Sequence, residues 1–389
     1  MAPIARSLRR LCQLAPLAAA GAALLFLAGC AVLPTTEPAR AALARLTEVP
    51  ARDGPSLGDA GILTLDAEMR AFLAKSVHGR DGLTKLRELI QAVVESPTFR
   101  LEYDDDTHTA AETFRELRGN CLSFTNLFVA LAREAGLTVS YQEVDVPPTW
   151  TLHDDTFVVS RHINALVTAR PGTSHVVDFN IADFRAAYPR RAISDERAAA
   201  HYFSNLGIES LEAGASAAAY EYFQRALAMD ATLAQTWVNL GAWYRRNGDA
   251  TRAEASYLQA LRLNPRELVA MSNLASLHRS AGQNDLAAWY QRRITKYRLQ
   301  NPYYRYASAK VAYLAGDFSG AVHQLRAALR GADGDPTFYS LLGMSYRELG
   351  KREPARRAFA RAVELARDGD LRGALRHKLE MLGAANAGT

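Results

Sequence analysis

The chain has 389 residues, of which 49% are hydrophobic and 22% are charged. This composition excludes an intrinsically disordered protein, and the length predicts two or three domains with cores of their own. The formal net charge is +5, but 43 basic residues face 41 acidic ones once Arg6, Arg9 and Arg10 are set aside. Because this balance gives no basic surface, we expect no nucleic-acid partner.

Residues 1–29 have the pattern of a bacterial export signal. The three arginines precede an apolar run from Leu11 to Leu27, which ends in the sequence LAGC at Cys30. The end of this run resembles a lipobox, which implies cleavage before Cys30 and acylation of that cysteine. An aspartate directly after the cysteine would resemble an inner-membrane retention signal, and none follows Cys30. We therefore expect a lipid anchor on the periplasmic face of the outer membrane. An ordinary signal peptide or an uncleaved anchor is the alternative.

Residues 30–58 are rich in alanine, proline and small polar residues without a sustained apolar period, which predicts a tether. Cys12 would leave with the export signal and Cys30 would carry lipid. Cys121 would then be the one free thiol, with no partner for an intramolecular disulfide.

Residues 59–198 are predicted to form an α+β domain. Apolar residues at three- and four-residue spacing indicate helices over 63–77 and 82–96, followed by a polar turn at 104–114. A strongly apolar helix then runs from Cys121 to a C-cap at Gly136. A strand follows over 137–146. Two further strands, 161–169 and 175–183, read as a hairpin joined by the turn sequence RPGTS.

The placement of Cys121 suggests chemistry. In the first turn of a helix, a cysteine meets backbone N–H groups without intrahelical acceptors, and the positive end of the helix dipole favours thiolate over thiol. His162 lies in one strand of the predicted hairpin and Asp178 in the other, so the two can lie within about one pair of residues of each other. The sequence therefore predicts a nucleophile, a base and an orienting carboxylate: Cys121, His162 and Asp178.

The segments GNCLSFTNLFVALAREAGL, RHINALV and VVDFN resemble the transglutaminase-like superfamily over about residues 63–183. The resemblance implies a papain-like fold in which Cys121, His162 and Asp178 form a catalytic triad without a cofactor. The superfamily includes bacterial proteins in which this domain is joined to tetratricopeptide repeats. The calcium-binding loops and flanking barrels of the animal cross-linking enzymes have no counterpart in this sequence.

Further residues are predicted to support the site. The Cys121 N–H is one candidate donor for an oxyanion hole, and Tyr103 or Asn120 could supply the second. Asn164 lies two residues beyond His162 and so faces the same side of its strand.

Two other interpretations remain open for these residues. Cys121 can be a packing residue of an apolar helix. A metal could bind His153, Asp154 and Asp155 together with His162 and His175, but this set lacks a regular helical spacing such as H-E-x-x-H, and we expect no metal.

Residues 199–389 repeat with a period of 34. The shift aligns FSNLG at 203–207 with WVNLG, MSNLA and YSLLG, and it aligns five glycines at 214, 248, 282, 316 and 350. These positions match the tetratricopeptide repeat, with five repeats starting near Ala200, Ala234, Leu268, Pro302 and Pro336. A last helix, 369–383, is predicted to cap the solenoid. Gln291 and Arg305 depart from the pattern, which predicts looser packing in the third and fourth repeats.

The tetratricopeptide resemblance implies that the first helix of each repeat lines a groove. Inward positions hold Arg245, Arg279, Lys310, Tyr313 and Arg347, which would form a basic groove for an acidic peptide or a C-terminal carboxylate. Solvated arginines on exposed helix faces are the alternative.

The sequence as a whole predicts an envelope lipoprotein. Its cysteine-dependent domain would transfer acyl groups from a protein or peptide substrate, and its repeats would recruit a protein partner. Whether it is a protease, a deamidase or a cross-linker depends on the loops near 146–158. The alternative is a non-catalytic scaffold that binds proteins.

Overall fold

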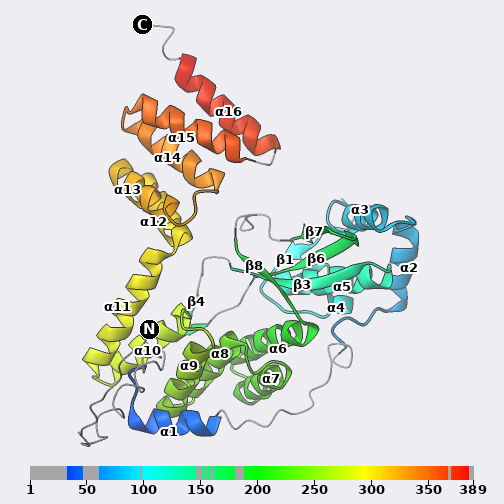
Figure 1. Ribbon diagram of the computed structural model, residues 1–389. Coiled ribbons are helices and arrows are strands. Elements are labelled where there is room, and N and C mark those ends of the chain that lie inside the picture. The colour runs from blue at the N-terminus through cyan, green and yellow to red at the C-terminus, as the bar shows by residue number, and fades with distance from the viewer. Residues whose placement is uncertain are drawn as a thin grey trace, which may run out of the picture. The chain divides into compact units, whose positions relative to one another are not determined.

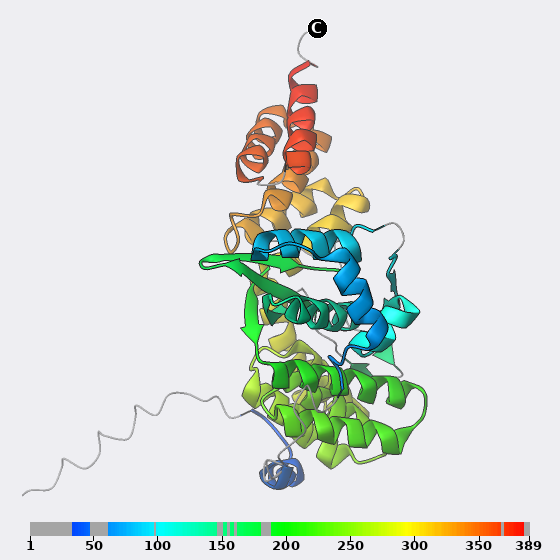
Figure 2. The same ribbon diagram turned by 90° about the vertical axis from the view of Figure 1, so that its right-hand side faces the viewer.

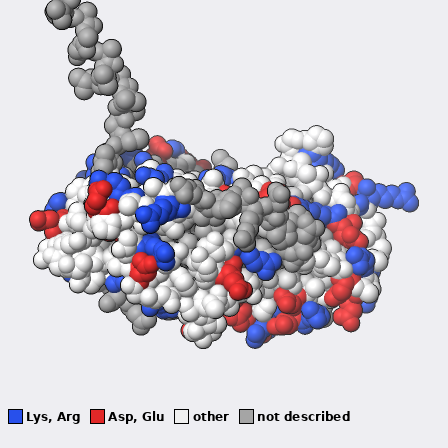
Figure 3. All heavy atoms as spheres, turned by 90° about the horizontal axis from the view of Figure 1, so that it is seen from below, with Lys and Arg blue, Asp and Glu red and all other residues white. Residues whose placement is uncertain are grey.

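In a computed structural model of the chain, the described residues are 33–46, 61–96, 99–145, 151–153, 156–158, 162–179, 188–366 and 369–384 (Figure 1). The described residues from Thr35 onward belong to one compact unit. Within the described residues, no helix is both long and apolar enough to cross a membrane. Basic and acidic side chains are interspersed on the face shown in Figure 3.

Part of the predicted tether is a helix. α1 (Glu37–Leu46) packs on α9 (Ala250–Leu263) and buries Ala39 and Leu43. The carboxylate of Glu254 in α9, which is itself buried, accepts hydrogen bonds from the Thr35 hydroxyl at 2.7 Å and from the Thr36 N–H at 2.8 Å. The sequence pattern gave no apolar period here because the helix needs only two buried residues, so the prediction of a tether was wrong for residues 37–46.

The α+β region begins with helices α2 (Ala67–Ser76) and α3 (Gly82–Val93), capped by Asp66 and Asp81. The predicted polar turn contains a helix, α4 (Ala110–Glu116), that we did not expect. Thr109 caps it, and the Glu112 side chain accepts a hydrogen bond from the Thr109 N–H at 2.8 Å. This capping box, T-x-x-E, is the sequence signal for the helix.

The main sheet has the strand order β7-β6-β3-β8 and is antiparallel throughout. The hairpin of β6 (His162–Arg170) and β7 (Thr173–Val177) is confirmed, although β7 ends earlier than predicted and residues 180–187 lie outside the described part. β3 (Thr138–Val144) pairs with β6 on one side and with β8 (Arg190–Ile193), which was not predicted, on the other. The remaining strands form two small pairs: β1 (Glu102–Tyr103) with β2 (Arg118–Gly119), and β4 (Thr151–His153) with β5 (Thr156–Val158).

The predicted helix at Cys121 is α5 (Cys121–Glu134), and it packs against β3 and β6. Residues 122 to 132 of α5 are all buried. The polar Asn126 among them accepts a hydrogen bond from the Tyr141 hydroxyl of β3 at 2.8 Å, so this buried polar pair fixes the helix on the sheet.

The repeats form five helix pairs. The first helices are α6 (Asp195–Glu212), α8 (Ala234–Arg246), α10 (Leu268–Ser280), α12 (Pro302–Leu314) and α14 (Pro336–Glu348). Their partners are α7 (Ser216–Met229), α9, α11 (Asn284–Gln300), α13 (Phe318–Leu329) and α15 (Arg352–Leu365), and α16 (Gly369–Ala384) follows. The aligned glycines take positive φ angles of 69° to 80° at the turns between paired helices, a conformation that favours glycine.

The first repeat shares its core with the α+β region. Ala198, Ala199, Tyr202 and Phe203 of α6, with Ala226 of α7, belong to the same buried cluster as α5 and the strands of the sheet. Figures 1 and 2 both show α6 next to this region. The boundary predicted at 198/199 therefore falls inside a helix and inside one continuous core.

Packing is looser between the third and fourth repeats, whereas the departures at Gln291 and Arg305 predicted looser packing within each of them. α11 has 17 residues, whereas α7, α9 and α15 have 14 each. Val311 on α12 is 69% exposed, whereas the residues 34 positions before and after it, Leu277 and Ser345, are 9% and 0% exposed. The longer helix thus moves the fourth repeat away from the third (Figure 1).

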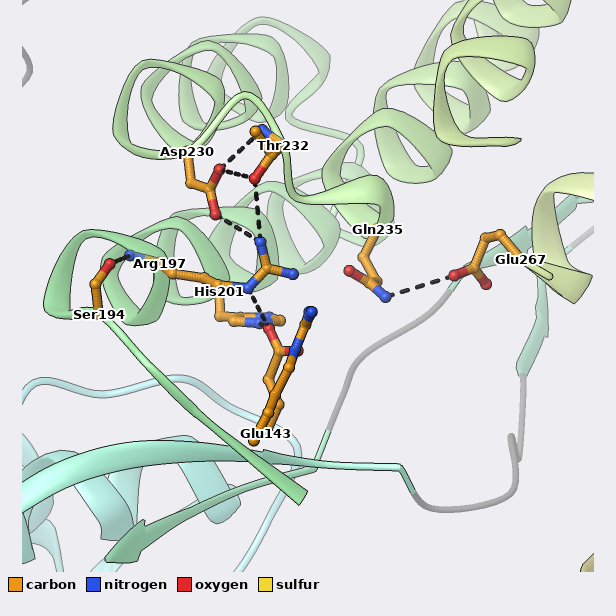
Figure 4. A network of polar contacts seen from close by, with 9 residues as sticks. Glu143, Ser194, Arg197, His201, Asp230, Thr232, Gln235 and Glu267 are labelled. Atoms are coloured by element: carbon orange, nitrogen blue, oxygen red, sulfur yellow. Dashed lines mark hydrogen bonds and ion pairs between the residues drawn. The ribbon is translucent and has the colours of Figure 1, made fainter. Parts of the chain in front are cut away.

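A buried ionic network joins the sheet to the first repeat (Figure 4). Glu143 of β3 accepts hydrogen bonds from Arg197 Nε at 2.5 Å and bonds His201 Nε2 at 2.8 Å. Arg197 also donates to Asp230 at 2.6 Å, and Arg191 of β8 donates to the second oxygen of Glu143 at 2.7 Å. Burial alone would raise the pKa of Glu143, but His201 and Arg197 together hold that pKa below its ordinary range.

Replacing Glu143 should destabilise the whole compact unit. Glu143→Gln would leave Arg197 and His201 buried without their anion, and we expect a loss of about 2–4 kcal/mol in the free energy of unfolding at pH 7. A carboxyl whose pKa is lowered on folding stabilises the fold above its unfolded pKa, so the difference between wild type and variant should shrink as pH falls below about 4.5. Urea unfolding at pH 7 and pH 4 measures both effects.

Glu134→Gln is the matched control, because its ion pair with Arg70 is exposed on both sides and should contribute less than about 1 kcal/mol. Equal stabilities of the Glu143→Gln and Glu134→Gln proteins would contradict a structural role for the network.

Candidate active site

The site is built on the first turn of α5. Asn120 is the N-cap, and its side-chain oxygen accepts hydrogen bonds from the N–H groups of Leu122 at 3.1 Å and Ser123 at 3.0 Å. Gly119 precedes it with a φ of 145°, and a Cβ there would lie 2.6 Å from the Cβ of Ser123. Only glycine fits this approach, so the G-N-C sequence sets the entry angle of the helix.

Cys121 is the first residue of α5 and is partly exposed. Of the first four helical N–H groups, those of Leu122 and Ser123 are bonded to the Asn120 side chain and that of Phe124 to the Asn120 carbonyl. The described residues provide no acceptor for the Cys121 N–H. This amide can therefore donate to an oxygen bound beside the thiol.

The register of the sheet brings His162 and Asp178 together. His162 and Asn164 alternate along β6 and face the same side. Val177 pairs with Ala165, so Asp178, the next residue, comes opposite Asn164 and close to His162. His162 Nε2 lies 2.7 Å from Asp178 Oδ2, and the two side chains are only 8% and 6% exposed.

Asn164 is a second partner of the same carboxylate. It is fully buried, and its Nδ2 donates to Asp178 Oδ2 at 2.7 Å. Asp178 is thus held by an amide from β6 as well as by the ring of His162. The predicted supporting residue Asn164 orients the carboxylate rather than reaching the thiol.

His162 is held in its charged form. Burial alone would lower its pKa, but the hydrogen bonds to Asp178 and to Cys121, with the charges of both groups, raise the pKa to about 10. Since Nε2 faces Asp178, Nδ1 is the ring nitrogen left for Cys121. The three predicted residues therefore lie together as a thiol, an imidazole and a carboxylate, in the order that nucleophilic catalysis requires.

Asn120 and Tyr103 have different positions from those we expected. The Asn120 amide nitrogen donates to Thr107 Oγ1 at 2.6 Å and to the Asp105 carbonyl at 3.4 Å, so both ends of this side chain are used in holding the helix entrance. Asn120 therefore positions α5 and is not a free donor for an oxyanion. Tyr103 is 59% exposed on β1, where it pairs in register with Gly119.

The metal alternative gains no support from the described residues. His162 uses its Nε2 on Asp178, His175 pairs with Val167 five residues further along β6, and Asp154 and Asp155 lie outside the described residues. Within the described ranges, one group of three ligand atoms lies within 4.8 Å: those of Asp104, Asp106 and His108. Arg118 forms ion pairs with both of these aspartates, so we assign no metal to them.

The predicted basic groove is not uniform. Arg279 and Lys310 are exposed. Arg245 donates to Ser276 Oγ at 3.1 Å, and Arg347 pairs with Glu348 at 2.7 Å and also bonds Tyr313. Two of the three predicted guanidinium groups are therefore already engaged within the chain.

A cavity of about 490 Å³ lies outside the triad, between the sheet and the repeats. It is lined by β3, β8 and residues of α6, α8 and α9, including Arg197 and Gln235, together with adjoining residues such as Asn264. Cys121, His162 and Asp178 are not part of its wall. The loops expected to control access to the thiol, 146–158, are described only as the strands β4 and β5.

Comparison with known proteins identifies the two parts. Residues 71–177 match the family model of the transglutaminase-like superfamily, and residues 234–267 and 336–368 match tetratricopeptide repeat models. A stretch of 131 residues is 29% identical to the general transcriptional corepressor trfA of Dictyostelium discoideum, covering 33% of this chain but 9% of that protein.

Several solved structures of repeat proteins are similar at low identity. YrrB, described as a tetratricopeptide protein with an unusual peptide-binding site, is 18% identical over 46% of this chain and 92% of its own, with a TM-score of 0.24. MamA is 19% identical over 43% of this chain and 91% of its own, with a TM-score of 0.24. PilF of Pseudomonas aeruginosa is 16% identical over 49% of this chain and 94% of its own, with a TM-score of 0.26.

The fold class is confirmed. The chain contains an α+β transglutaminase-like domain followed by an all-α tetratricopeptide solenoid. The triad lies within or directly beside the matched transglutaminase-like segment, since Asp178 is one residue beyond it.

The carboxylate should set the charge of the imidazole. Asp178→Asn removes the anion that raises the pKa of His162, so the ring should lose its proton at a lower pH than in wild type, where it stays charged up to about pH 10. An NMR titration of the His162 ring protons measures this shift, and alkylation of Cys121 should slow in parallel. An unchanged titration in Asp178→Asn would contradict the assigned ion pair.

Proposed function

We propose that this protein is a cysteine-dependent acyl-transfer enzyme of the cell envelope that acts on proteins or peptides. The single observation that supports this most is the buried contact of 2.7 Å between His162 and Asp178, beside a cysteine at the start of a helix. If these residues only packed in the core, the site would need neither a buried carboxylate nor a charged imidazole.

In the proposed reaction, the Cys121 thiolate attacks the carbonyl carbon of an amide. The oxyanion that forms lies within reach of the Cys121 N–H. His162 gives its proton to the leaving amine as the C–N bond breaks and a thioester forms. Water or a second amine then attacks the thioester, His162 takes its proton, and the thiolate leaves.

Product masses distinguish the three versions of this chemistry. The protein is incubated with a mixture of glutamine-containing peptides and a primary amine, and the products are analysed by mass spectrometry. Deamidation gives the acid, cross-linking adds the amine, and proteolysis gives fragments. We expect one of these products with wild type and a loss of at least about 100-fold in both Cys121→Ala and His162→Ala.

The alternative is a protein-binding scaffold without catalysis. The tetratricopeptide repeats support a protein partner for either function. Arg279 and Lys310 are exposed and could attract an acidic partner. If wild type gives no more product than Cys121→Ala, and both capture the same envelope proteins, the scaffold is the better description.

We also propose that the protein is anchored by lipid at Cys30 to the periplasmic face of the outer membrane. The proposal rests on the export signal and lipobox-like sequence that end at Cys30, which lies outside the described residues. α1 begins seven residues later, so a lipid on Cys30 would hold α1 close to the membrane.

Cys30→Ser should abolish acylation. The variant should lose metabolic labelling with palmitate and should move from the membrane fraction to the soluble fraction or accumulate unprocessed. A free thiol at Cys30 in the mature wild-type protein, detected by mass spectrometry, would rule out the anchor.

A further inference from the structure

A carboxylate from the first repeat contacts the loop between β1 and α4, residues 104–109, which we call the active-site loop. Glu209 lies on α6, and its Oε1 accepts a hydrogen bond from the N–H of Thr107 at 3.0 Å. Thr107 is 5% exposed and belongs to the loop between β1 and α4, more than a hundred residues earlier in the chain. The contact thus crosses from the solenoid to the transglutaminase-like domain.

Thr107 also contacts the residue that caps the start of α5. Its hydroxyl oxygen accepts from Asn120 Nδ2 at 2.6 Å, and the Asn120 oxygen caps the N–H groups of Leu122 and Ser123. The same loop is bonded to the entrance on both sides of Thr107, because the Asp106 carbonyl accepts from the Asn120 N–H at 3.1 Å and the His108 N–H donates to Ser123 Oγ at 2.8 Å. Glu209 therefore anchors, from outside, the loop that holds the first turn of the nucleophile helix.

The repeat pattern does not explain a carboxylate at this position. At intervals of 34 residues, Glu209 corresponds to Trp243, Leu277, Val311 and Ser345, none of which is charged. In the second repeat this position faces the preceding element, since Trp243 Nε1 donates to the Ser216 carbonyl of α7 at 2.7 Å. For the first repeat, the preceding element is the active-site loop, and the residue is acidic there.

Ionisation of Glu209 in the folded protein lowers the free energy of unfolding. Burial raises the pKa of Glu209 to about 7, and the hydrogen bonds from Thr107 only partly oppose this effect. The other charges acting on it are those of Asp106 in the loop and Glu212 on α6, both acidic, and the ring of Tyr202 on α6 lies within electrostatic range. A carboxyl whose pKa is raised on folding favours the folded state at low pH, and this contribution is lost as pH rises through about 7.

We propose that Glu209 is a positioning residue for Cys121: its carboxylate, acting through Thr107 and Asn120, holds the first turn of α5 in the reactive geometry. A charged acceptor forms the stronger hydrogen bond, so the loop is held best when Glu209 is ionised. The first repeat is then a working part of the active site, and the thiol should become more reactive as Glu209 loses its proton. This inference rests on the proposed function of Cys121.

The test compares the full-length wild type with Glu209→Gln between pH 5.5 and pH 8.5. Gln keeps a neutral acceptor of the same shape but cannot ionise. Iodoacetamide is the probe, and mass spectrometry of the Cys121 peptide separates this thiol from Cys12 and Cys30. Thermal unfolding is followed in the same buffers. Glu221→Gln, an exposed residue of α7 in the same repeat, is the matched control.

We expect the wild-type and Glu209→Gln rates to be equal at pH 5.5 and to differ roughly tenfold in favour of wild type at pH 8.5, with the change centred near pH 7. Over the same range, Glu209→Gln should become the more stable protein, by roughly 2–5 °C in Tm at pH 8.5. A variant that is more stable yet less reactive is not the result of a structural defect. Glu221→Gln should match wild type in both measurements.

Two results would overturn the proposal. A ratio of wild-type to Glu209→Gln rates that stays near one at every pH shows that the carboxylate does not act on Cys121. A loss of both stability and reactivity in Glu209→Gln shows a structural role only. If the wild-type thiol reacts no faster than free cysteine, the proposed function fails as well, and this third outcome is distinct from the other two.

Discussion

The first turn of α5 is the constraint on which the rest of the structure depends. Asn120 satisfies two of its amide groups, Gly119 sets the approach of the chain, and the helix that follows is buried along eleven consecutive residues. A helix this deeply buried has little freedom to move, so the place of Cys121 follows from the packing of the whole core. The sheet must then bring an imidazole to that place, and β6 does so at its first residue, His162.

The stacking face of the first repeat performs a second task. In a solenoid, each repeat covers the preceding one, and a first repeat has no predecessor. Here the transglutaminase-like domain fills that position: α6 shares its core, the Glu143–Arg197 network ties it to β3, and Glu209 holds the active-site loop. The two parts that the family models separate therefore share one continuous core, and we expect stability and reactivity to be coupled across them.

Two different electrostatic designs occur in this unit. Glu143 is surrounded by cations, so its charge stabilises the fold. Glu209 is half-buried beside other acids, so its charge costs stability, and its carboxylate accepts a hydrogen bond from the Thr107 N–H. Buried carboxylates of the second kind are found more often where a protein uses the charge than where it only packs. Burial alone therefore does not separate a structural acid from a functional one. The charges of the neighbouring residues must be considered as well.

The sequence by itself determined the local features of this protein. The 34-residue period placed the first helices of four repeats at their observed first residues, because each repeat packs by the same small and aromatic positions. Cys121 at a helix start, His162 on β6 and Asp178 directly after the paired strand β7 also followed from local pattern. Only tertiary structure decided what pattern cannot encode: that residues 37–46 form a helix against α9, that Asn120 is committed to Thr107, and that Glu209 reaches the active-site loop. These depend on contacts between residues about 13 to more than 200 positions apart, and the periodicity of a single segment carries no information about its distant neighbours.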